Sequence, residues 1–131
     1  MDRRHLLALA SAAALSACYS IIEPDINLPP DAQLVAPLDD YAQWYAEVEL
    51  CTGVDGDFDA IRWFSVPHEQ WWDPIWEQYT TGTWREPHDI YLADGRRETQ
   101  SLVRHEMVHD VLQGGLTYDP RFERCSGLGH R

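Results

Sequence analysis

The region around residues 99–113 constrains the fold of this chain most, because its sequence predicts a buried helix. Thr99 is a suitable N-cap, and Gly114 follows as a strong helix stop. Apolar side chains occupy every side of the helix axis: Leu102, Val103, Met107, Val108, Val111 and Leu112. A helix that is apolar all round is buried in a domain. Three ionisable residues nevertheless lie inside it, His105, Glu106 and His109. Because unpaired polar groups are costly to bury, these three side chains need partners.

These residues form the pattern His-Glu-x-x-His, which suits a metal ion. His105 and His109 are four positions apart and share one helix face, so both imidazoles can bind one Zn²⁺. Glu106 lies about 100° further round the helix, where it can act as general base on a zinc-bound water. The run resembles the core of the zincin metallopeptidases, and the resemblance covers the motif and its helix. The alternative is a helix whose histidines are satisfied by neighbouring side chains.

A catalytic zinc site keeps three protein ligands, and the sequence leaves the third ligand open. The metzincin pattern would place a histidine where this chain has Gly115, so that branch is excluded. Asp119 is the first choice, because the Gly114-Gly115 turn lets the chain reverse toward the metal and Pro120 stiffens the approach. The alternatives are His130 as the ligand, or Asp119 as a turn residue that caps its own backbone.

The first 17 residues read as a targeting segment. Arg3 and Arg4 form a basic start, and the apolar stretch 6–15 is too short to span a membrane. The run 15–18, Leu-Ser-Ala-Cys, resembles a bacterial lipoprotein signal. The resemblance implies that Cys18 carries lipid such as palmitate, and that Tyr19 after it favours the outer membrane. We therefore expect a membrane partner through an N-terminal lipid anchor, in the bacterial cell envelope and facing the periplasm. The alternative is an ordinary cleaved signal with an incidental cysteine.

Two further cysteines, Cys51 and Cys125, form an even pair in a chain expected to be exported. Export favours a disulfide between them. The alternative for Cys125 is a free thiol or a metal ligand.

The charge of the chain excludes one class of partner. The formal net charge is −12, and all ten basic residues are arginine. Nucleic acid is therefore not expected as a partner, because its phosphates would repel so acidic a domain. A chain of 131 residues fits one small domain.

Outside residues 99–113, the pattern predicts a Pro-rich tether over 18–37, a helix from Asp39 or Asp40 to Leu50, and strands over 60–66 and 88–93. Residues 67–79 suggest two short helical turns, broken at Asp73. The zincin resemblance implies that strand 88–93 is a sheet edge that binds extended substrate. The clustered indoles of Trp71, Trp72, Trp76 and Trp84 favour core and one cleft wall over a sugar-stacking platform.

Together these features predict an α+β fold: a single small zincin-like domain, residues 38–131, with a buried metal-binding helix and a short sheet. The function expected from the resemblance is a zinc-dependent metallopeptidase that hydrolyses peptide bonds in the cell envelope, with Glu106 as general base. The alternative is an envelope lipoprotein without catalysis, which binds zinc, carbohydrate or protein. The sequence does not identify the peptide or protein substrate.

Overall fold

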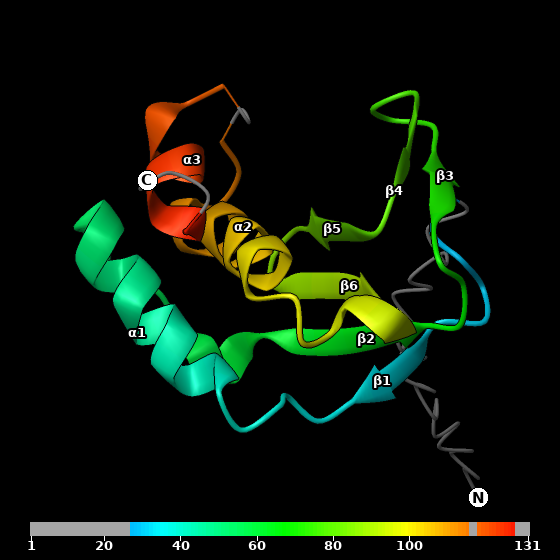
Figure 1. The fold of residues 1–131 in the computed structure, drawn as a ribbon, viewed down its shortest axis with the longest axis horizontal. Helices are drawn as coiled ribbons and strands as arrows, with labels where there is room; N and C mark the ends of the chain where they lie inside the picture. Colours follow the sequence, from blue (N-terminus) through cyan, green and yellow to red (C-terminus); the bar gives the residue numbers. More distant parts are fainter. Residues whose placement is uncertain (1–26, 116–117, 128–131) are drawn as a thin grey trace, which may run out of the picture.

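The structure, a computed structural model, describes residues 27–115 and 118–127. It shows a small mixed α+β domain with three helices and two small sheets (Figure 1). The expected α+β class is confirmed at this level. The signal segment 1–17, Cys18, the start of the expected tether and His130 lie outside the described residues. Within those residues, none of the helices has the length and apolarity needed to cross a membrane.

The larger sheet has four strands in the order β1 (Gln33–Val35), β2 (Arg62–Val66), β6 (Asp89–Ala93) and β5 (Gly82–Arg85). β2 and β6 run parallel, while the other neighbours are antiparallel. The predicted strands 60–66 and 88–93 are thus confirmed as β2 and β6. However, β6 lies inside the sheet, so the expectation that 88–93 forms its edge is wrong. The edge strand near α2 is β5, which contacts this helix.

The first strand lies in a segment whose proline content predicts a tether. Gln33–Val35 pairs with β2, and Val35 packs against the core. This end of the segment 18–37 therefore joins the sheet, and regular structure begins before the first helix.

The second sheet is a two-stranded hairpin, β3 (Trp71–Asp73) and β4 (Gln78–Thr80), where short helical turns were expected. The Asp73 carboxylate accepts the N–H groups of Ile75 at 2.9 Å and Trp76 at 3.4 Å. Asp73 therefore organises a tight turn instead of capping a helix. Glu77 completes the turn with a positive φ of 50°. In Figure 1 the hairpin rises from the sheet as a separate arm.

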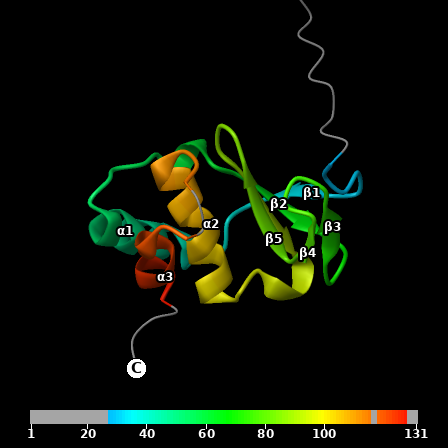
Figure 2. The same ribbon diagram turned by 90° about the horizontal axis from the view of Figure 1, so that it is seen from above.

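Three helices pack together beside the four-stranded sheet: α1 (Tyr41–Thr52), α2 (Gln100–Leu112) and α3 (Pro120–Ser126). Figure 2 shows α2 between the other two helices and the sheet. α1 and α2 match the helices predicted over 39–50 and 99–113 to within two residues, whereas the sequence did not predict α3. α1 ends at Gly53, whose φ of 73° suits glycine.

The core lies where α1, α2 and α3 meet the inner face of the sheet. Its fully buried apolar side chains include Tyr41, Tyr45, Val48, Ile90, Val103, Met107, Val108 and Phe122. A disulfide joins Cys51 at the end of α1 to Cys125 in α3, with 5.6 Å between their Cα atoms. The predicted pairing of these two cysteines is confirmed.

Candidate functional site

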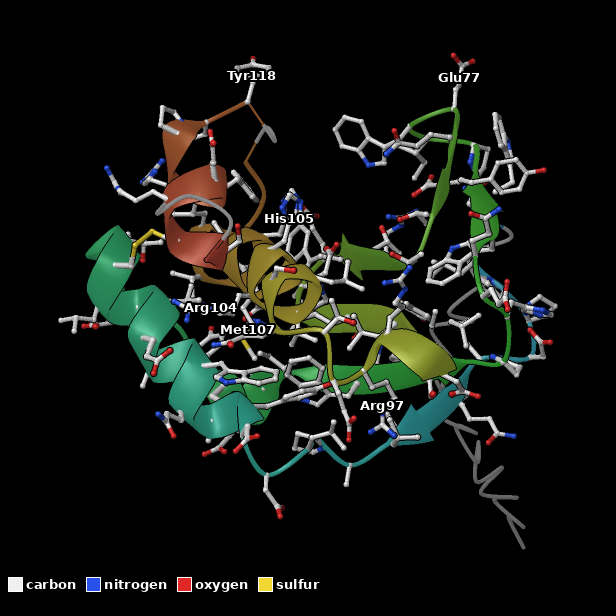
Figure 3. All side chains as sticks on the ribbon, viewed as in Figure 1. Glu77, Arg97, Arg104, His105, Met107 and Tyr118 are labelled. Atoms are coloured by element: carbon white, nitrogen blue, oxygen red, sulfur yellow. A yellow bond between two sulfur atoms is a disulfide. The ribbon has the colours of Figure 1, made fainter. Side chains whose placement is uncertain are left out.

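A cleft of about 430 Å³ opens between α2, β5 and the hairpin. His105, Glu106 and His109 all contribute to its lining, so the helix presents the whole motif to one hollow. In Figure 3, His105 lies above α2, between α3 and the hairpin. The remaining lining comes from the hairpin residues Asp73, Ile75, Trp76, Gln78 and Thr80, from β5 and Glu86, and from Gly114 and Gly115.

The His109 ring is held in one orientation. Its Nδ1 lies 2.8 Å from the carbonyl oxygen of Gly114. Because a carbonyl only accepts, Nδ1 carries the proton and the lone pair is on Nε2. The Trp84 indole lies parallel to the ring, with an interplanar angle of 11° and 6.2 Å between centroids. A hydrogen bond from one ring nitrogen to a carbonyl fixes the tautomer of a histidine and leaves the other nitrogen as an acceptor or metal ligand.

The two imidazoles lie close together against an apolar side chain. The ring centroids of His105 and His109 are 5.1 Å apart, and Phe122 of α3 packs against both. Burial, and then the neighbouring His109, lowers the pKa of His105 to about 4, and burial lowers the pKa of His109. Both rings are therefore neutral near pH 7, which is the form that binds metal ions.

Glu106 is almost completely buried at the base of the cleft. Burial raises the pKa of its carboxyl to about 8; the charge of Asp73 acts in the same direction and that of Arg85 opposes it. A carboxyl group that titrates near neutral pH can both accept and return a proton, as general acid–base catalysis requires. Glu106 is thus chemically suited to the role expected from the motif.

An ion pair joins the hairpin to β5 at the wall of the cleft. Arg85 Nη2 lies 3.2 Å from Asp73 Oδ2, and both side chains are largely buried. Arg85 also donates to Thr83 Oγ1 at 2.6 Å. The pair fixes the arm relative to the sheet and places one positive charge near Glu106.

Asp110, next to His109, has a structural role on the other side of α2. Its fully buried carboxylate meets three groups from other segments: Tyr45 Oη at 2.8 Å, Trp84 Nε1 at 3.0 Å and His88 Nδ1 at 2.9 Å. These contacts tie α1, β5 and the residue before β6 to α2. Because Trp84 stacks on His109, Asp110 also fixes the indole that orients that ring.

Asp119 is not brought together with the two histidines. Its carboxylate caps α3 through the Arg121 N–H at 3.0 Å and forms an ion pair with Arg121 at 2.7 Å. The hydrogen bonds from Arg121 lower the pKa of Asp119 to about 2. Of the other histidines, His68 pairs with Asp31 at 2.7 Å, away from this cleft. Within residues 27–115 and 118–127, no group of three or more His, Cys, Asp or Glu side chains gathers where it could hold a metal ion.

Several side chains of the site could not be identified from the sequence. Trp84 and Phe122 support the histidines, yet they come from β5 and α3, which the sequence did not predict. The sequence indicated Trp84 only as one of four clustered tryptophans and did not indicate its contact with His109. Phe122 lies between charged residues in the run Arg121-Phe122-Glu123-Arg124, so the local sequence does not point to the cleft.

Comparison of the chain with protein-family models, with curated proteins and with solved structures finds no match.

Proposed function

We propose that this chain is a zinc-dependent metallopeptidase of the zincin type that cleaves peptide bonds in the bacterial cell envelope. The observation that carries the proposal is the joint placement of His105, Glu106 and His109 on one cleft. Two neutral imidazoles and a buried carboxyl of raised pKa form the protein part of such a centre.

The residues present fit two of the ligand positions of a zinc ion. His109 would bind through Nε2, because its Nδ1 donates to Gly114, and the adjacent His105 would supply the second imidazole. Zn²⁺ held there would polarise a peptide carbonyl and make a water molecule more acidic. The third ligand stays a prediction: Asp119 could serve only after leaving Arg121, and His130 lies outside the described residues.

The chain's own groups account for the proton transfers. Glu106 in its ionised form takes a proton from the attacking water and then returns it to the leaving amine. Its burial keeps the carboxyl away from bulk water, so the proton is not lost between the two steps. The charge of Arg85 favours the ionised form that begins the cycle.

β5 is the strand best placed to hold an extended peptide. It is the edge of the four-stranded sheet in the described structure, and Gly82, Thr83, Trp84 and Arg85 all line the cleft. A peptide that pairs with this edge would run past the histidines, the role that the zincin resemblance had implied for 88–93. Anchorage through lipid on Cys18 completes the proposal and would confine the activity to the surface of the outer membrane that faces the periplasm.

Metal content and peptide cleavage test this proposal. We expect about one zinc per purified chain by elemental mass spectrometry, retained in Glu106→Gln and lost in His109→Ala. His68→Ala is the matched control, because His68 is a histidine of the same domain that does not line the cleft. The Glu106→Gln chain should bind zinc but lose cleavage of a peptide library. A folded chain that takes up no added zinc would refute the peptidase assignment.

A non-catalytic binding protein is the second candidate, and the exposed aromatic side chains of the hairpin favour it. Trp72 and Tyr79 are both exposed, but their rings meet edge-on at 75°, which does not form a flat platform for sugars. Protein binding is therefore the stronger form of this alternative. Zinc bound without any peptide cleavage would support it.

A further inference from the structure

The hairpin carries an unusual share of the exposed apolar surface. Among the described residues, seven large apolar side chains are exposed, and four of them lie on this arm: Trp72, Ile75, Trp76 and Tyr79. Exposed apolar side chains gathered on one element mark a binding surface more often than isolated ones do. The two faces of the arm differ in what they meet.

One face of the arm points away from the cleft. Trp72 and Tyr79 are cross-strand partners, and their ring centroids lie 5.3 Å apart. Trp72 borders a separate hollow lined by residues 27–31, and neither ring lines the cleft. These two aromatic side chains contact each other edge-on, and both remain exposed to solvent.

The turn of the arm faces the proposed catalytic groups. Ile75 and Trp76 line the cleft together with His105, Glu106 and His109. Asp73 holds the N–H groups of both turn residues and is itself fixed by Arg85. The apolar wall is therefore positioned by a buried ion pair, and the opposite wall is α2.

The charges around the cleft indicate which ligands the wall would accept. Of the carboxylates that line it, Asp73 is paired with Arg85, so Glu86 is the exposed acidic side chain beside the wall. Glu77 stands at the tip of the arm, as Figure 3 shows. Residues 67–82 contain no lysine or arginine, and the chain has a formal charge of −12. Such a surface disfavours acidic peptides and anionic bilayers and favours neutral or cationic peptides.

We propose that Ile75 and Trp76 form a subsite that binds an apolar or aromatic side chain of an extended peptide, with basic residues favoured next to it by Glu86. This inference rests on the proposed peptidase function, because the peptide would be the substrate. Covering one large apolar side chain against this wall would increase affinity by about tenfold or more relative to alanine. A lipid surface is the weaker reading, since Glu77 would have to enter the bilayer with the aromatic tip.

Peptide binding tests the subsite. The purified full chain carrying Glu106→Gln, with and without added zinc, would be titrated into fluorescein-labelled Ala-Ala-X-Ala-Arg-Ala amides. X is Phe, Leu, Ala or Asp, and fluorescence anisotropy gives Kd. We expect Phe and Leu to bind about tenfold more tightly than Ala, and Asp to bind most weakly. Adding Trp76→Ala should reduce the preference for Phe over Ala to about twofold or less.

Trp72→Ala is the matched control, because Trp72 is on the same hairpin and is equally exposed, 51% against 50% for Trp76, but does not line the cleft. It should leave the Phe preference unchanged.

Equal Kd values for Phe and Ala, no measurable binding, or equal losses in both tryptophan variants would overturn the subsite. Sedimentation with phosphatidylethanolamine–phosphatidylglycerol vesicles tests the lipid alternative. If the fraction of protein that sediments with the vesicles falls equally in Trp72→Ala and Trp76→Ala, the arm binds membranes and the subsite is overturned. Trp76-dependent Phe binding in a chain that takes up no zinc would support the subsite while refuting the peptidase.

Discussion

Breaking the disulfide between Cys51 and Cys125 should remove much of the stability of this domain. The two residues are 74 positions apart, so the bond closes a loop that includes β2, β5, β6, the hairpin and α2. In the chain-entropy model, a loop of this length stabilises the folded state by about 4.5 kcal/mol at 25 °C. Small domains have total stabilities of about 5–15 kcal/mol, so the reduced chain should be marginally stable.

Urea unfolding followed by circular dichroism, with and without a reducing agent, measures this effect. For a urea dependence of about 2 kcal/mol per molar, the expected loss lowers the unfolding midpoint by about 2 M. The double variant Cys51→Ala, Cys125→Ala is the control: its midpoint should match that of the reduced chain and should not respond to reductant. A midpoint that moves by less than about 0.5 M on reduction, or roughly 1 kcal/mol, would refute the reasoning.

Two further predictions concern the ionisable groups of α2. Asp110→Ala should lower the free energy of unfolding by about 3–5 kcal/mol in the same urea assay, because it leaves one buried and two partly buried donors from other segments without their acceptor. A loss below about 1 kcal/mol would show that water replaces the carboxylate. For Glu106, the folded-state pKa of about 8 lies above the ordinary value of 4.5. The folded zinc-free chain therefore keeps a proton that the unfolded chain releases, and stability falls as the pH rises through this window. In the presence of EDTA, Glu106→Gln should gain on the order of a few kcal/mol relative to the unsubstituted chain between pH 4.5 and pH 8; parallel pH profiles would contradict the assignment.

The elements that could be predicted from the sequence are those with strong local signals. Residues 99–113 combine a cap position, apolar residues and a glycine stop, and they form α2 as expected. The strand predictions succeeded for β2 and β6, which are buried and rich in apolar residues. These patterns depend on residues close together in the chain, so they predict the elements without knowledge of tertiary contacts.

The missed elements depend on partners far away in the sequence. β5 has only four residues, Gly-Thr-Trp-Arg, and is a strand because it pairs with β6. The sequence Asp73-Pro74 favours a helix start, but Asp73 instead pairs with Arg85 and stabilises the hairpin turn. The position of the motif residues followed from helix periodicity, whereas the partners around them followed from tertiary contacts. For this reason the local sequence could not predict that Trp84 and Phe122 pack against the histidines, or that Asp119 pairs with Arg121.

The surroundings of the two histidines also connect the stability of the fold to the chemistry of the cleft. α2 supplies His105 and His109, but their ring positions depend on Phe122 of α3. α3 has only seven residues, too few to be stable alone, and the disulfide at Cys125 attaches it to α1. Gly114, just after the C-cap of α2, also fixes the tautomer of His109 through its carbonyl. Reduction of the disulfide should therefore loosen the imidazole pair before α2 itself unfolds, so the zinc site that we propose would depend on an intact disulfide.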